Sequence, residues 1–127
     1  MTPHKTDFAY LWDMREAAIE AVQAMTDIDR EHFLVDSIRV RAVERLIEII
    51  GEAAYHVSPL ERRELTDIPW EKIVSQRHVL AHGYGEIDRS RLFDVVSVNL
   101  SPLIEILDKV GLEPSLLRPD SSGKNKS

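Results

Sequence analysis

The sequence contains no cysteine among its 127 residues. Disulfide bonds, thiolate metal sites and cysteine nucleophiles are therefore excluded together. The absence fits the reducing conditions of the cytosol, and we expect a cytoplasmic protein.

Long hydrophobic runs are also missing. No apolar stretch approaches the roughly 20 residues that a membrane-spanning helix requires, so we expect no membrane association. The first ten residues, MTPHKTDFAY, lack a basic lead followed by an apolar segment, which argues against a signal peptide.

Basic residues are outnumbered. The 16 Lys and Arg residues stand against 22 Asp and Glu residues, which gives a formal net charge of -6. Nucleic-acid-binding proteins commonly gain affinity by neutralising phosphates with Lys and Arg, so an acidic surface disfavours nucleic acid at long range. A role on nucleic acid would require a local positive cleft, and a basic protein partner is the simpler inference from charge alone.

Helical periodicity dominates the sequence. Apolar residues recur in steps of three and four through residues 7–25, 37–57 and 89–110. A further helix is expected to have Pro69 in its first turn and to end at the glycines of HGYGE, while TDIDREHFLVD and SPLERREL each suggest a short helix. We find no strand pattern. The sequence therefore predicts an all-α fold, an up-and-down bundle of four main helices plus short helices.

The C-terminal part of the chain contains two features that interrupt helices. Pro102, inside the last predicted helix, has no N–H to donate and is expected to kink it. The sequence GLEPSLLRPDSSGKNKS that follows is rich in Pro, Ser and Lys. We expect one helical domain over residues 1–110 and a flexible tail over 111–127.

The stretch RHVLAHGYGE, residues 77–86, collects an arginine, two histidines, a tyrosine and a glutamate where a helix is expected to end. At 100° per residue, Arg77 and His82 are roughly 140° apart on an ideal helix. They cannot face one point unless the helix ends between them or a second chain supplies the missing partner. His78 and His82, four residues apart, do share a face.

Three interpretations of this stretch stay open from the residues alone. His and Arg near a helix C-terminus interact favourably with the macrodipole and could be purely structural. His78 and His82 with Glu86 nearby could chelate zinc, although no further ligand is spaced convincingly and the neighbouring arginine would repel the ion. The third interpretation is phosphoester cleavage of RNA.

RNA cleavage by the 2′-hydroxyl needs a base, an acid for the departing 5′-oxygen and positive charge at the phosphate. A histidine that titrates near neutrality can serve as acid or base, and an arginine binds phosphate oxygens bidentately. One Arg and one His per chain make a sparse site. Two chains that meet along this helix would bring two of each and would also resolve the angle between Arg77 and His82.

RHVLAHGY fits an R-x4-H-x-Y pattern, and the sequence resembles the HepT-like toxins, a branch of the HEPN superfamily. The resemblance extends over roughly residues 7–110, through YLWDMREAA, AVERLIEIIGEAA, IPWEKIVSQRHVLAHGYGEID and NLSPLIEIL. R-x4-H alone is a weak pattern, but four segments in the same order are specific. The chain departs from the usual motif at His78, where many relatives have Asn, and at Gly83, where a polar residue is common.

The resemblance implies a HEPN-like homodimer whose two motifs line a shared cleft that cuts RNA without a metal or other cofactor. Arg77 and His82 would be its catalytic pair, and His78 is a candidate auxiliary residue. It also implies the toxin of a type II or type VII-like toxin–antitoxin system, paired with an MNT-type nucleotidyltransferase antitoxin. That enzyme would neutralise the toxin by AMPylation of Tyr84, because the added phosphates place negative charge and bulk where RNA must enter.

A function of a different class remains open. The chain could be a binding module without turnover whose role is to form a complex with the nucleotidyltransferase, and the acidic net charge favours this alternative.

Several residues outside the motif have structural explanations. Trp70 is expected in the core or at the dimer interface. A hydrogen bond between helices explains Asn99 at least as well as a chemical role does. Glu44, Glu48 and Glu52 are expected to form a solvated acidic face on one helix, and the alternative is that this acidic row docks a basic patch on the antitoxin.

Overall fold

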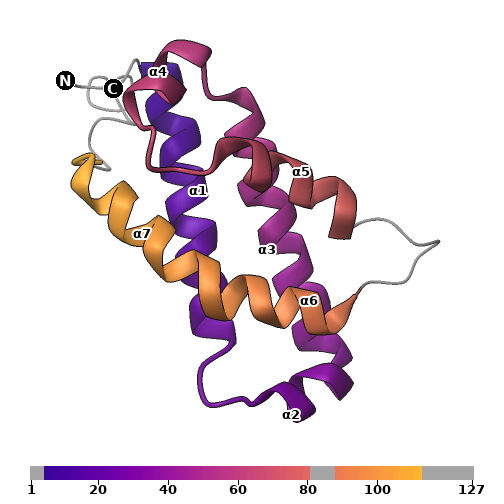
Figure 1. Ribbon diagram of the computed structural model, residues 1–127. Coiled ribbons are helices and arrows are strands. Elements are labelled where there is room, and N and C mark those ends of the chain that lie inside the picture. Colours follow the sequence, from indigo (N-terminus) through magenta and orange to yellow (C-terminus); the bar gives the residue numbers. More distant parts are fainter. Residues whose placement is uncertain (1–4, 81–87, 113–127) are drawn as a thin grey trace, which may run out of the picture.

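The computed structural model describes residues 5–80 and 88–112 of the chain (Figure 1). Every regular element within these ranges is helical, which confirms the predicted all-α fold. The elements are α1 Lys5–Ala24, α2 Arg30–Val35, α3 Ser37–His56, α4 Pro59–Glu64, α5 Trp70–Leu80, α6 Arg89–Asp94, the π-helical turn η1 Val95–Asn99 and α7 Leu100–Lys109.

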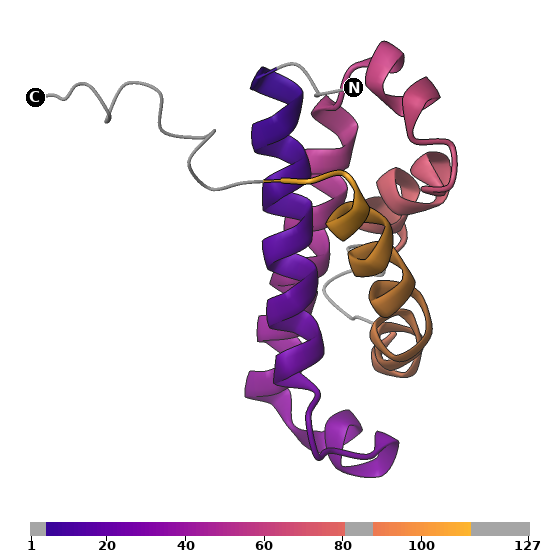
Figure 2. The same ribbon diagram turned by 90° about the vertical axis from the view of Figure 1, so that its left-hand side faces the viewer.

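The two long helices α1 and α3 form the centre of the bundle and run side by side in opposite directions (Figures 1 and 2). Helix α5 packs on α3, while α6, η1 and α7 form one rod that contacts both long helices. Side chains from these helices and from α2 make one hydrophobic core, which includes Leu11, Met14, Phe33, Val43, Ile47, Ile50, Trp70, Ile73, Leu92, Val96, Leu103 and Leu107. Burial of this apolar surface holds the helices together.

Capping side chains determine where several helices begin. Asp29, Asp36, Ser58 and Asp88 each accept a hydrogen bond from the backbone N–H three residues later, which satisfies a donor that a helix start leaves free. Pro59 follows directly in the first turn of α4, a position that needs no N–H. The observed bounds of α1 and α3 lie within two residues of those predicted from periodicity.

Pro69 precedes α5 and does not lie in its first turn, so this prediction is wrong by one residue. Helix α5 begins at Trp70, and the carbonyl oxygen of Pro69 accepts a hydrogen bond from the N–H of Ile73 at 3.0 Å. Pro69 therefore occupies the N-cap position. A proline is tolerated there for the same reason as in the first turn, since neither position needs its N–H for the helical ladder.

The single helix predicted over residues 89–110 is instead composed of α6, η1 and α7. Pro102, near the start of α7, has no N–H to donate to the carbonyl of Val98, so a regular α-helical ladder cannot run through that residue. The irregularity lies near the predicted place but takes the form of a π-helical turn. Figure 1 shows that the rod nevertheless stays continuous.

The last described helix ends at a glycine. Gly111 has a φ of +80°, a left-handed conformation that glycine adopts without a steric penalty. Residues 113–127 lie outside the described ranges, so the domain boundary at residue 110 and the flexible tail stay predictions. Among the described helices, none is long and apolar enough to cross a membrane.

Candidate functional site

Helix α5 carries the first residues of the predicted site. Arg77 and His78 belong to the C-terminal part of this helix. His82 and Tyr84 fall within residues 81–87, which lie outside the described ranges. The structure therefore defines the helix that leads into the motif, while the catalytic pair, the auxiliary histidine and the modified tyrosine stay predictions.

The beginning of α5 is anchored in the core. Trp70 is 8% exposed, and its indole Nε1 donates a hydrogen bond to the carbonyl oxygen of Leu65 at 3.0 Å. The guanidinium carbon of Arg62 lies 5.6 Å from the centre of the Trp70 ring. Burial of Trp70 in the core is thus confirmed, and it fixes the direction in which α5 approaches the motif.

The beginning of α6, immediately after residues 81–87, is held by contacts with the junction of α2 and α3. Asp88 caps α6 by accepting a hydrogen bond from the N–H of Arg91 at 3.0 Å. The guanidinium of Arg89 donates to the carbonyl oxygen of Leu34 at 2.8 Å and to the hydroxyl of Ser37 at 3.2 Å. These bonds attach the start of α6 to the junction of α2 and α3.

A second arginine strengthens the same attachment. Arg30 donates to the carbonyl oxygen of Ser90 at 3.2 Å and to its hydroxyl at 2.7 Å, and pairs with Asp94. Its guanidinium carbon also lies 4.8 Å from the centre of the Phe93 ring. The motif is therefore flanked by one helix packed on α3 and another tied to α2, so the scaffold fixes the positions from which residues 81–87 depart and return.

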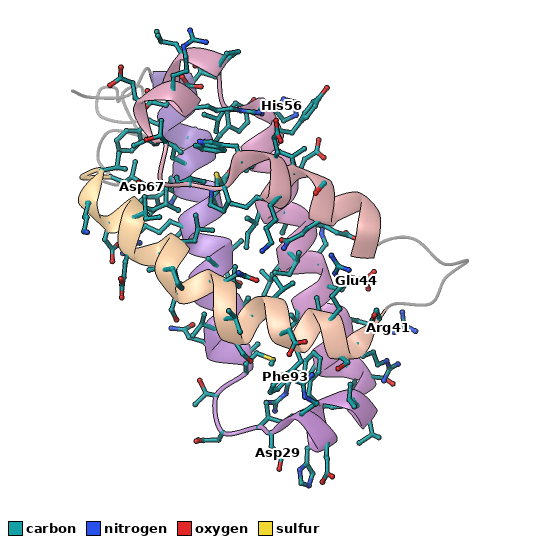
Figure 3. All side chains as sticks on the ribbon, viewed as in Figure 1. Asp29, Arg41, Glu44, His56, Asp67 and Phe93 are labelled. Atoms are coloured by element: carbon teal, nitrogen blue, oxygen red, sulfur yellow. The ribbon has the colours of Figure 1, made fainter. Side chains whose placement is uncertain are left out.

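Helix α3 contributes charges next to both flanking helices. Figure 3 shows Glu44 and Arg41 on α3 beside the end of α5 and the start of α6. Glu44 and Glu48 are half-buried, so the predicted solvated acidic face is correct only for Glu52, whose side chain is 60% exposed. Burial raises the pKa of Glu44, the nearby carboxylate of Glu48 raises it further, and Arg41 opposes both effects.

A cavity of about 240 Å³ lies between α3, α5 and η1–α7. Most of its lining is apolar, and the polar side chains that line it come from Asp67, Lys72, Gln76 and Asn99. Asn99 is half-buried at this cavity and makes no side-chain hydrogen bond to any residue that the structure describes. The predicted inter-helix hydrogen bond of Asn99 is therefore not found within residues 5–80 and 88–112, and its amide borders the cavity.

Gln76 is a feature of this region that the sequence reading missed. It precedes Arg77 directly and is only 8% exposed, an unusual degree of burial for a glutamine. A signal was present in the sequence, because Trp70, Ile73 and Gln76 follow the i, i+3, i+6 spacing of one helix face. An amide on an otherwise apolar, buried stripe is a candidate for ligand recognition.

The described residues provide no set of side chains that could bind zinc. Among residues 5–80 and 88–112, no group of three or more His, Cys, Asp or Glu side chains could hold a metal ion. The alternative depends on His82 and Glu86, which lie outside those ranges.

Comparisons with known proteins agree on one family. The family model described as Ribonuclease HepT-like matches residues 15–110. A protein of Methanocaldococcus jannaschii that carries a provisional RNase name is 34% identical over 88 residues, which cover 69% of this chain and 81% of that protein. The provisionally named ribonuclease HepT of Thermococcus cleftensis is 36% identical over 95 residues, which cover 74% of this chain and 86% of that protein. No solved structure matches the chain.

Proposed function

The chain belongs to the HepT-like ribonuclease family, and from that premise we propose that it is a metal-independent endoribonuclease with Arg77 and His82 as its catalytic residues. The observation that carries the proposal is the family match over residues 15–110, which includes all of α5 and the complete R-x4-H-x-Y motif. The RNase names of the two relatives support the same activity.

The proposed reaction uses the 2′-hydroxyl of the RNA as the nucleophile. One His82 imidazole accepts the hydroxyl proton, the 2′-oxygen attacks the adjacent phosphorus, and a second imidazole donates a proton to the departing 5′-oxygen. Arg77 stabilises the negative charge that develops on the phosphate oxygens through two parallel hydrogen bonds. The products are a 2′,3′-cyclic phosphate and a free 5′-hydroxyl, so the reaction balances without a metal ion or any other cofactor.

The proposed reaction requires two imidazoles, one as the base and one as the acid, and each chain supplies one at the R-x4-H position. We therefore propose a homodimer in which two copies of α5 bring both motifs to a shared cleft. Such a cleft would concentrate two arginines on a chain whose formal net charge is -6, which answers the charge objection to an RNA substrate.

The chain is further proposed to act as a toxin in the cytoplasm, paired with an MNT-type nucleotidyltransferase antitoxin. AMPylation of Tyr84 would silence it. Tyr84 lies two residues after His82 in the sequence, so a phosphate group on its hydroxyl would introduce negative charge next to the site that must accept an RNA phosphate.

Cleavage assays with matched variants test the catalytic proposal. Purified wild-type protein should cut single-stranded RNA in the presence of EDTA, whereas Arg77→Ala and His82→Ala should not. Arg63→Ala and His32→Ala are suitable controls, because both residues are exposed and lie on α4 and α2. Full cleavage by both motif variants, with circular dichroism spectra like that of the wild type, would show that the catalytic residues lie elsewhere.

The acidic net charge favours a second candidate function. In this alternative the chain is a binding module that forms a complex with the nucleotidyltransferase but does not cleave RNA. The same assay separates the two. A binding module would copurify with the nucleotidyltransferase yet leave RNA intact at every protein concentration, and its binding would be indifferent to His82→Ala.

A further inference from the structure

The cavity between α3, α5 and η1–α7 has a composition suited to a small planar ligand. Its apolar walls include Ile47 and Ile50 from α3, Ile73 from α5 and Leu103 from α7. Its volume of about 240 Å³ is below the roughly 300–1,000 Å³ typical of pockets for drug-sized ligands. A cavity of this size has room for one ring system but not for a whole helix.

The side-chain amide of Gln76 is the feature of this cavity that indicates a bound ligand. The residue is 8% exposed and lines the cavity, yet its side-chain amide makes no hydrogen bond to any residue that the structure describes. A buried amide without a partner destabilises a folded protein, because it has lost its hydrogen bonds to water without replacement. Such a group needs a hydrogen-bond partner beyond the described residues, and a ligand in the cavity would supply one.

The other polar groups at the cavity narrow the class of ligand. Asn99 provides a second amide, so two groups that each carry both a donor and an acceptor border one apolar space. Lys72 contributes a cation and Asp67 a carboxylate that can accept a hydrogen bond from an amino group. Figure 3 shows Asp67 on the side of α7, away from the end of α5. A lipid tail would leave the amides unsatisfied, whereas a nucleobase offers an apolar ring face together with donors and acceptors along its edge.

We infer that this cavity binds one nucleobase of the RNA substrate and thereby selects where the RNA is cut. The inference rests on the proposed ribonuclease function. Gln76 and Arg77 are consecutive, so their Cα atoms are about 3.8 Å apart. The cavity and the proposed phosphate site therefore lie along the same turn of α5, and the proposal is that the base in the cavity and the phosphate at Arg77 belong to one RNA strand.

Gln76 would act as a specificity residue in this arrangement. Its amide discriminates among bases by matching the order of donor and acceptor on the base edge, since a mismatched base leaves buried polar groups unpaired. The Ile and Leu walls pack against the face of any base, and the apolar burial contributes affinity without selection. Loss of the amide should then relax base preference more than it slows cleavage.

A binding experiment tests the cavity without reference to cleavage. Isotope-labelled full-length protein is titrated with the 5′-monophosphates of adenosine, guanosine, cytidine and uridine, and the side-chain amide and methyl signals are followed by NMR. We expect shifts at Gln76, Asn99 and Leu103 with at least one nucleotide, and a loss of affinity of about tenfold in Gln76→Leu. Gln23→Leu, which removes an exposed amide on α1, is the matched control and should bind as the wild type does. Absence of cavity shifts with all four nucleotides would overturn the inference.

A stability measurement separates recognition from a structural role. Gln76→Leu replaces a buried amide, which makes no hydrogen bond to any residue that the structure describes, by an apolar group of similar size. The nucleotide-free variant should therefore melt at a higher temperature than the wild type. A lower melting temperature would show that the amide has a structural partner. A change in oligomeric state, measured by light scattering, would show that the cavity is a contact between subunits.

Sequencing of the products from a random RNA pool tests the consequence for cleavage. Wild-type protein should show a preference of about tenfold for one base beside the cut, and Gln76→Leu should lose it while still cutting. If Gln76→Leu keeps the wild-type preference, the cavity does not select the base, although the ribonuclease function stands. If wild-type protein cuts no RNA, the proposed function fails, and the nucleotide titration still decides whether the cavity binds a base.

Discussion

The guanidinium of Arg89 donates a hydrogen bond to the main-chain oxygen of Leu34 at 2.8 Å, across 55 residues of sequence. A second bond reaches the hydroxyl of Ser37 at 3.2 Å. Together they secure the first turn of α6 to the α2–α3 junction. Arg89 therefore contributes, together with Arg30, to fixing the position at which the chain re-enters the bundle after the motif.

Arg89→Ala should reduce RNA cleavage by about tenfold or more, because even small displacements of catalytic groups are costly to the rate. Loss of the two hydrogen bonds should also lower the free energy of unfolding by about 1–3 kcal/mol. Cleavage rates at saturating RNA and urea unfolding curves measure the two effects. Arg91→Ala removes an exposed arginine from the same helix and should change neither quantity appreciably. Equal cleavage rates for both variants would show that the attachment of α6 does not position the site.

The carboxylate of Asp7 joins the start of α1 to the corner between α3 and α4. It is 5% exposed and accepts hydrogen bonds from the backbone N–H of Ser58 at 2.8 Å and from its hydroxyl at 2.7 Å. Asp7→Ala should lower the free energy of unfolding by about 2 kcal/mol, since it leaves two partly buried donors unpaired. Urea unfolding with Glu20→Ala as the control, an exposed acid on the same helix, measures the difference. A loss no larger than that of the control would mean that water replaces the carboxylate at no cost.

Glu44 gives the protein a pH dependence of predictable sign. Its pKa is raised in the folded state, first by burial and then by Glu48, so the folded protein holds this proton to a higher pH than the unfolded chain does. The folded state is therefore disfavoured progressively as pH rises from the ordinary pKa of Glu44 through its raised value, and the full penalty is present at neutral pH. Glu44→Gln should remove this penalty.

The expected result is a gain in the free energy of unfolding at pH 7 of about 0.5 kcal/mol or less, because the group is only partly buried. At a pH below the ordinary pKa of glutamate the gain should vanish. Thermal melts of wild type and Glu44→Gln at both pH values measure it, with Glu105→Gln on an exposed part of α7 as the control. A gain of the same size at both pH values would point to a cause other than ionisation.

The sequence predicts the helices well because burial on a helix repeats every three to four residues along the chain itself. The errors are local: α5 begins one residue later than predicted, and the helix predicted over residues 89–110 contains a π-helical turn. The contacts of Arg89 and Arg30 with partners 55 and 60 residues away follow from the tertiary arrangement, which local spacing does not report. Gln76 was overlooked for a related reason, because whether a glutamine on a helix face is buried depends on what packs against that face.

Modification of Tyr84 should be visible as added mass. Co-expression with the proposed MNT-type nucleotidyltransferase antitoxin should increase the intact mass of the protein by one or more adenylate units, and Tyr84→Phe should abolish the increase. Tyr55→Phe is the control, since Tyr55 is an exposed tyrosine on α3 and should leave the increase unchanged. Modified protein should also lose RNA cleavage, because the added phosphate repels the RNA backbone. An unchanged mass gain in Tyr84→Phe would place the modification on another residue.

Mixed dimers test whether the active site is shared between two chains. Equal amounts of wild-type and His82→Ala protein, unfolded together and refolded, should give one quarter wild-type dimers, one half heterodimers and one quarter variant dimers. Because the proposed reaction needs one imidazole as base and another as acid, a heterodimer with a single His82 should be inactive, and the mixture should keep roughly a quarter of the wild-type cleavage rate. Each protein refolded alone provides the baseline. If the mixture keeps about half of the wild-type rate, each chain carries its own active site and the site is not shared.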